Sequence, residues 1–157
     1  MRSRISAGIV LYRVRDDELE VFIAHPGGPL FTHKDDGHWS IPKGEAEPGE
    51  DLLATAIREF EEEVGLPLDP RSEFLPLGTI QQKGGKIVHA WAVRGDWPVD
   101  RPIQSNLFTI EWPPGSGRMQ EFPEVDRAGF FPLADARQKL KPTQVPLLER
   151  LEESLRS

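Results

Sequence analysis

The order of predicted elements along this chain indicates an α/β fold in which a mixed sheet lies between helices. Three observations support that class: strand patterns precede an amphipathic helix at residues 50–64, further strand patterns follow it, and helical patterns end the chain. The chain has 157 residues, a length suited to one domain with one core. We therefore expect a single domain over residues 1–157.

The N-terminal part of the chain predicts two strands and a long loop. The alternation in residues 5–12 and the apolar run 21–24 indicate strands, and the charged turn 16–18 joins them as an antiparallel hairpin. From His25 to Gly44 the composition shifts to Gly, Pro, Asp and His, which predicts a loop carrying Trp39. Long loops in compact domains are more often functional than slack.

Residues 50–64 predict a helix with one apolar face that can pack on a sheet. Its apolar side chains recur at three- and four-residue steps; they are Leu53, Ala56, Ile57, Phe60 and Val64. Glu59, Glu62 and Glu63 fall elsewhere on the helix, where residues three and four positions apart are neighbours. We expect these three carboxylates to share one patch, with Glu61 pointing away from it.

The chain after this helix predicts a second hairpin. Residues 74–81 and 86–93 have strand patterns around the turn Lys83-Gly84-Gly85, and residues 107–112 are a further candidate strand.

The remaining segments alternate between irregular and regular patterns. Residues 94–104 and 113–123 are rich in proline and are predicted to be irregular. Residues 127–132 predict a short strand, and residues 133–140 and 142–155 predict the two C-terminal helices.

Composition excludes several classes of function. The sequence has no cysteine, which excludes disulfides, thiolate zinc sites and a cysteine nucleophile. Its net charge of −7 argues against sequence-independent nucleic-acid binding, which needs a basic face, but not against nucleotide substrates. No stretch approaches the roughly 20 apolar residues of a membrane helix. We expect a cytoplasmic, soluble protein with neither a nucleic-acid nor a membrane partner.

The acidic patch on the helix predicts a metal site. Three like charges at helical spacing repel one another, whereas a hard divalent cation such as Mg²⁺ turns that repulsion into coordination. A solvated acidic face is the ordinary alternative. Such a face has no need of Arg58, Glu50 and two glycines at matching positions, so we favour the metal site.

These residues also form a known pattern. The segment GEAEPGEDLLATAIREFEEEVGL, residues 44–66, fills every fixed position of the Nudix box; these are Gly44, Glu50, Arg58, Glu59, Phe60, Glu62, Glu63, Gly65 and Leu66. The chain therefore resembles the Nudix hydrolase superfamily. The resemblance implies an α/β/α sandwich and metal-dependent hydrolysis of a pyrophosphate bond in a nucleoside diphosphate linked to another moiety.

The resemblance also implies roles for residues in and around the box. Metal ligands are expected to be Glu59, Glu62 and Glu63, with the backbone carbonyl of Lys43; Mg²⁺ is the expected ion and Mn²⁺ a substitute. Arg58 is expected to orient Glu50 through two hydrogen bonds. The extra catalytic carboxylate of many Nudix enzymes is carried onto Glu124, with Glu121 as its rival. The general base is one of the box glutamates or Glu124.

Substrate contacts are predicted on both sides of the box. Lys43, Lys83 and Lys86 are candidate phosphate contacts, although Lys83 and Lys86 also fit ordinary solvated lysines. Trp39, Trp91 and Phe108 are candidates to stack on a base, with core packing the alternative for Trp91. His38 is a further candidate, because it lies beside Trp39.

The segments outside the box narrow the range of expected substrates. The lead-in at residues 39–44 and the late segment at residues 124–136 are similar to diadenosine polyphosphate hydrolases, although the only tyrosine, Tyr12, precedes the box. A nucleoside triphosphate pyrophosphohydrolase that sanitises the nucleotide pool is the second interpretation, and a non-catalytic nucleotide-binding sensor is the third. The expected partner is a small nucleotide, and the protein is a monomer or a homodimer.

Overall fold

A six-stranded mixed sheet forms the centre of the computed structural model, which describes residues 5–156. Its strands are β1 (Ile5–Arg15), β2 (Glu18–Pro26), β3 (Lys43–Glu45), β4 (Leu75–Gln81), β5 (Ile87–Arg94) and β8 (Val125–Pro132). They follow the order β4-β5-β1-β2-β8, and the short β3 also pairs with β1. β1 and β5 run parallel while the other pairs are antiparallel, so the sheet is mixed as predicted.

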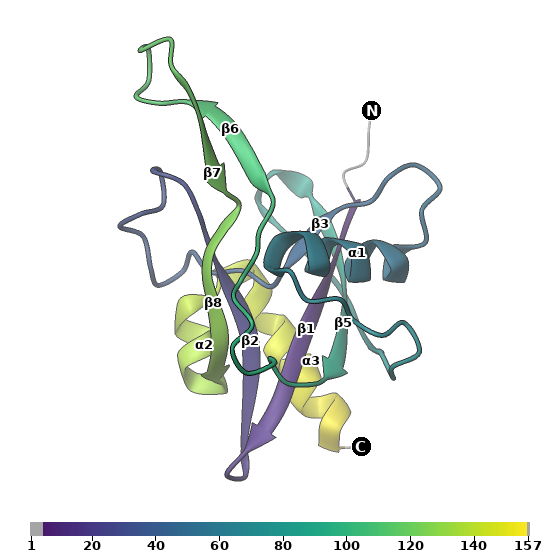
Figure 1. Cartoon of the computed structure of the whole chain (residues 1–157). Coiled ribbons are helices and arrows are strands. Elements are labelled where there is room, and N and C mark those ends of the chain that lie inside the picture. Colours follow the sequence, from purple (N-terminus) through teal and green to yellow (C-terminus); the bar gives the residue numbers. More distant parts are fainter. Residues whose placement is uncertain (1–4, 157) are drawn as a thin grey trace.

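Helices cover both faces of this sheet (Figure 1). α1 (Leu52–Val64) packs on one face, and α2 (Leu133–Lys139) and α3 (Val145–Arg156) pack on the other. The predicted α/β/α sandwich is confirmed. The expectation of one core is wrong, because the sheet separates two apolar clusters, one under α1 and one under α2 and α3.

The alternation along β1 explains why the sheet has two apolar faces. Successive side chains of a strand point to opposite faces. Ile9 and Leu11 accordingly join the cluster with α1, while Val10 and Tyr12 join the cluster with α3.

The predicted hairpin of β1 and β2 is confirmed, and both strands are longer than predicted. Arg15 pairs with Glu18, which leaves a two-residue turn at Asp16 and Asp17. Both turn residues have positive φ, 54° and 63°, as hairpin turns of this length require.

α1 begins at Leu52, so Glu50 precedes the helix. Asp51 is the N-cap residue, and its side chain accepts a hydrogen bond from the backbone N–H of Ala54. Gly65 ends the helix in the left-handed conformation at φ 90°, where its N–H donates to the Glu61 carbonyl. The two caps fix where α1 begins and ends, so Glu59, Glu62 and Glu63 all lie within the helix.

Two strands lie where the sequence predicted none. Residues 113–123 were expected to be irregular, but β7 (Met119–Pro123) pairs with β6 (Leu107–Glu111) as a separate antiparallel hairpin. This arm projects away from the sheet (Figure 1). β6 alternates between exposed and half-buried residues, whereas β7 begins with three exposed residues and has no such alternation. β3 was also missed, because three residues are too few for a pattern.

The other predicted elements are confirmed with shifted bounds. The turn after β4 contains a short 3₁₀ helix, η1 (Lys83–Gly85), and the last helix is preceded by a second one, η2 (Pro142–Gln144). No helix within residues 5–156 is long and apolar enough to cross a membrane.

Candidate active site

Arg58 is at the centre of the acidic face of α1. Its guanidinium donates to both carboxylate oxygens of Glu50, each at 2.9 Å, which is the paired geometry expected from the box. The same side chain donates to Glu59 at 2.9 Å and to Glu62 at 2.7 Å. These bonds lower the pKa of Glu50 to about 2 and raise the pKa of Arg58. Arg58 therefore joins Glu50, in the loop before α1, to two of the predicted metal ligands.

The predicted catalytic glutamates are electrostatically coupled. Burial raises the pKa of Glu59, and the charge of Glu62 raises it further. Burial raises the pKa of Glu63 to about 8, with smaller contributions from Glu124 and Glu59. Glu124 has a raised pKa from burial and from Glu62. The structure thus brings together the four carboxylates that the sequence assigned to one site.

β3 places two residues of the lead-in against these carboxylates. The backbone N–H of Lys43 donates to Glu63 at 3.2 Å. A Cβ atom on Gly44 would overlap the carboxyl group of Glu59. Only glycine leaves room here for Glu59, which explains the glycine that opens the box.

Glu124 is held in place by main-chain bonds at the junction of β7 and β8. Its N–H donates to the carbonyl of Asn106 at 2.8 Å, and its carbonyl accepts from Gly27 at 2.9 Å. Asn106 in turn donates from its backbone to the Glu62 carbonyl at 2.9 Å and from its side chain to the Glu62 carboxylate at 3.4 Å. The rival Glu121 lies on the arm opposite Thr109 and does not line the pocket described next.

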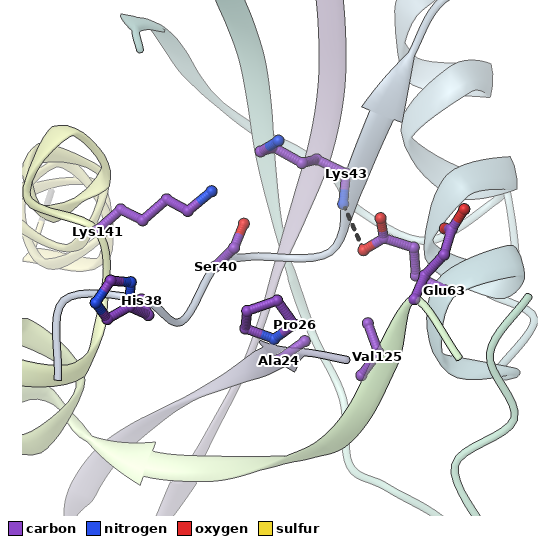
Figure 2. Close-up of a pocket in the computed structure, with 9 residues that line it drawn as sticks. Ala24, Pro26, His38, Ser40, Lys43, Glu63, Val125 and Lys141 are labelled. Carbon is purple, nitrogen blue, oxygen red and sulfur yellow. Dashed lines mark hydrogen bonds between the residues drawn. The ribbon is translucent and has the colours of Figure 1, made fainter. Parts of the chain in front are cut away.

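A pocket of about 140 Å³ lies beside these glutamates (Figure 2). Its lining residues come from five separate stretches of the chain; they are Ala24, Pro26, His38, Ser40, Lys43, Glu63, Glu124, Val125 and Lys141. The predicted residues His38 and Lys43 are therefore in the same pocket as Glu63 and Glu124. Lys141 and the Glu62-bonded Asn106 were not predicted, because each is a single polar residue in a stretch without a motif.

Lysines occupy the side of the site opposite the glutamates. Burial lowers the pKa of Lys43 to about 8, and the nearby charges of Lys86 and Lys141 lower it further. Lys86 also forms an ion pair with Glu45 at 3.5 Å. Lys83 is exposed on η1 and does not line the pocket. Two of the three predicted phosphate contacts, Lys43 and Lys86, thus lie near one another.

Trp39 is part of the apolar cluster under α2 and α3 and does not line the pocket. Its side chain is 4% exposed, and its ring contacts His25 and Phe131 edge-on, with centroids 5.3 Å and 5.1 Å away. Its Nε1–H donates to Asp35 at 2.7 Å. This packing leaves no free ring face on which a base can stack. The other two aromatic candidates also pack within the protein: Trp91 against the α1 cluster and Phe108 against Phe122.

Comparison with known proteins identifies the family. The NUDIX domain model matches residues 2–151. The chain belongs to the Nudix family. Over 61 residues it is 36% identical to the asymmetrical bis(5'-nucleosyl)-tetraphosphatase of Caenorhabditis elegans, a match that covers 39% of the Nudix chain and 40% of that relative.

Solved structures share the fold of this Nudix chain. A binary complex of Caenorhabditis elegans Ap4A hydrolase is 22% identical with a TM-score of 0.70. The match covers 96% of the Nudix chain and 98% of the Ap4A hydrolase chain. The NUDIX domain of Shewanella oneidensis NrtR in complex with ADP ribose is 18% identical with a TM-score of 0.66, covering 99% and 90% respectively. At these identities the likeness is one of fold.

The glutamates of the Nudix box fit a divalent cation in residue type and charge. Within residues 5–156, no three His, Asp or Glu side chains are already grouped as a metal site, and Arg58 holds Glu59 and Glu62. Yet repulsion among the glutamates contributes to the raised pKa of Glu59, Glu63 and Glu124. A cation beside them would relieve that repulsion, and hard divalent cations take oxygen ligands of this kind.

Proposed function

We propose that this Nudix protein is a metal-dependent pyrophosphohydrolase that cleaves a nucleoside diphosphate linked to another moiety, with a dinucleoside polyphosphate as its substrate. The observation that carries the proposal is one pocket with coupled carboxylates on one side and lysines on the other. A phosphate chain needs both, because its charge must be neutralised while one of its phosphorus atoms is attacked. We also propose that residues 1–157 work as a single domain.

Each part of the site has a distinct task in this proposal. Glu59, Glu62 and Glu63, with the carbonyl of Lys43, would hold Mg²⁺, or Mn²⁺ in its place, and the ion would supply charge stabilisation for the phosphoryl oxygens. Arg58 keeps Glu59 and Glu62 in position through its paired bonds to Glu50. This arrangement rests on bonds that are already formed in the protein without substrate.

Glu124 is the proposed general base. It lines the pocket, and in the described part of the chain no side chain donates a hydrogen bond to its carboxylate. Its raised pKa brings it nearer to neutral pH, where a base accepts a proton from water most effectively. The proton would pass from the attacking water to the Glu124 carboxylate. Lys43 and His38 line the pocket and would contact the phosphate chain. Lys86 lies outside the lining but close enough to Lys43 to affect its pKa, so it remains a candidate contact. Lys83 is the weaker candidate, because it is exposed on η1 and also lies outside the lining.

The substrate class rests on the tetraphosphatase relative and on the two segments outside the box that were similar to diadenosine polyphosphate hydrolases. The sequence match includes 61 residues at 36% identity, which favours a dinucleoside polyphosphate over a nucleoside triphosphate. The burial of Trp39 means that recognition of the base must use other groups than that ring.

Product analysis tests the proposal. The protein is incubated with diadenosine tetraphosphate, ATP or ADP-ribose in the presence of Mg²⁺, and products are separated by ion-exchange chromatography. We expect diadenosine tetraphosphate to be cleaved to two nucleotides faster than the other two compounds are cleaved, and chelation of the metal to stop the reaction. Preferred release of AMP and pyrophosphate from ATP would establish the triphosphate alternative instead. Binding of a nucleotide with no product from any compound would establish the sensor.

A further inference from the structure

Lys141 lies in the short junction between α2 and η2, and backbone bonds fix its position. Its N–H donates to the carbonyl of Trp39 at 2.9 Å, and its carbonyl accepts from Gln144 at 2.8 Å. Leu140 and Trp39 are paired in a β-bridge directly beside it. The junction is therefore attached to the segment that leads into Lys43, far away in the sequence.

Gln144 strengthens this attachment from inside the core. Its side chain is fully buried. Its Oε1 accepts from the backbone N–H of Ile41 at 2.9 Å, and its Nε2 donates to Ser40 Oγ at 2.9 Å and to Gln82 Oε1 at 3.0 Å. A buried and fully bonded amide of this kind holds its neighbours in one arrangement. Lys141 and Lys43 thus keep a fixed relative position.

The Lys141 side chain reaches the pocket without a carboxylate partner. It is a lining residue, and Figure 2 shows it extending toward Ser40 and Lys43. Two other lysines nearby form ion pairs, Lys139 with Asp35 at 3.0 Å and Lys86 with Glu45 at 3.5 Å. Within residues 5–156 Lys141 has no such pair. Its pKa is lowered by burial and by Lys86, and Glu63 offsets this only in part.

A half-buried ammonium group without a paired carboxylate is costly unless an anion arrives. The cost indicates that the group serves binding rather than stability. We propose that Lys141 is a phosphate-binding residue of this pocket, where it faces Lys43 and binds an anionic oxygen of the phosphate chain. The identity of that chain as part of a nucleotide rests on the proposed function, whereas binding of phosphate oxygens at Lys141 does not.

Binding of a phosphate-chain mimic tests the inference without turnover. The probe is methylenediphosphonate, whose P–C–P link cannot be hydrolysed, titrated into the full-length protein by calorimetry in the presence of Mg²⁺. We expect Lys141→Gln and Lys141→Met each to lower the affinity about 10- to 100-fold, the range for a hydrogen bond to a charged group. Lys141→Arg keeps the charge and should restore most of the affinity. Lys34→Gln is the matched control, because Lys34 is exposed and outside the pocket.

Thermal unfolding separates a binding role from a structural one. Removing an unpaired, half-buried charge should leave the unfolding midpoint of both Lys141 variants unchanged or higher. For the substrate, KM should rise more than kcat falls. Unchanged affinity in both variants, or lost affinity together with a lowered midpoint, would overturn the inference, as would wild-type protein that does not bind the probe.

The two proposals fail in different ways. A wild-type protein that binds the probe through Lys141 but cleaves no nucleotide would refute the proposed function and leave this inference standing. Normal cleavage with unchanged probe affinity and unchanged KM in the Lys141 variants would refute this inference and leave the proposed function standing.

Discussion

Glu50 and Glu63 are both glutamates of the Nudix box, yet their carboxyl groups have opposite pKa shifts. Two hydrogen bonds from Arg58 lower the pKa of Glu50 to about 2. Burial raises the pKa of Glu63 to about 8, and the one backbone bond from Lys43 does not compensate. The residue type is the same, so the difference comes from the neighbouring groups. Glu50 is held as an anion by Arg58. Glu63 is buried, so its charged form would be stabilised by a cation bound nearby.

Glu62 provides the most direct test of the acidic cluster. Glu62→Gln removes a charge that also acts on Glu59 and Glu124, so we expect kcat to fall about 10²- to 10³-fold while the fold is kept. Steady-state turnover at saturating Mg²⁺ measures the first effect and circular dichroism the second. Glu61→Gln is the control, since Glu61 is exposed on the same helix, and it should retain wild-type turnover. Wild-type turnover in Glu62→Gln would contradict the assignment.

Arg58 should contribute to both the thermal stability of the protein and its turnover rate. Arg58→Ala leaves Glu50 without its paired partner and releases Glu59 and Glu62 to repel each other. We expect the thermal midpoint to fall by about 2–4 °C and kcat to fall at least 10-fold. Arg137→Ala removes an exposed ion pair with Glu152 and should change neither quantity measurably. An Arg58 variant with normal stability and normal turnover would show that the guanidinium does not organise the site.

At the scale of elements, the site depends on how closely β3 approaches α1. β3 pairs with β1 through Ala7 and Gly44, which brings the backbone of Gly44 against the Glu59 side chain. The approach is close because Gly44 has no side chain, and because α1 rests on β1 through Phe60 and Val64. A strand of three residues thus limits where the Glu59 carboxylate can point.

Gly44→Ala tests that approach. The added methyl group would occupy the space of the Glu59 carboxylate, so we expect Glu59 to be displaced and kcat to fall about 10-fold or more, with little loss of stability because Glu59 can turn toward solvent. Turnover and urea unfolding are measured on the same preparation. Gly129→Ala is the matched control in β8, where an added Cβ meets nothing within 4 Å. Equal turnover in the two variants would show that Gly44 is not needed for Glu59.

Sequence patterns predicted the elements with strong periodicity and missed those without it. α1 was predicted closely because its apolar stripe recurs at helical spacing within one continuous segment. β7 was missed because Met119, Gln120 and Glu121 are exposed and show no alternation. Three of the four carboxylates of the site, Glu59, Glu62 and Glu63, lie within α1 and were therefore visible in the box.

The basic half of the site was only partly predicted. Lys141 and Asn106 reach the site through pairing between segments far apart in the chain, and nothing in their local sequence indicates it. Trp39 was expected as a candidate for stacking, whereas Asp35 and Phe131 hold it in the core. Contacts of this kind depend on tertiary packing, which a local pattern does not contain.

At the scale of the whole molecule, the site is assembled from segments that belong to both sides of the sheet. α1 supplies the glutamates, the junction of β7 and β8 supplies Glu124, and the junction of α2 and η2 supplies Lys141. The apolar clusters on the two faces hold these parts at constant separation. The arm of β6 and β7 is different, since it extends outside both layers (Figure 1).

The tip of the arm should therefore be dispensable for stability. Its bonds are internal: the Glu111 carboxylate accepts from the N–H groups of Gly115 and Gly117, and Trp112 pairs with Arg118. Replacing residues 113–117 by an Asn-Gly turn joins the paired residues Trp112 and Arg118 and keeps the register of β6 and β7. This replacement should leave the thermal midpoint within about 2 °C of wild type and the transition cooperative. Calorimetry measures both, and hydrogen exchange should show arm amides opening far faster than those of β1. A loss of cooperativity, or arm amides protected as strongly as β1, would mean that the arm is an integral part of the fold, because only global unfolding would then expose it.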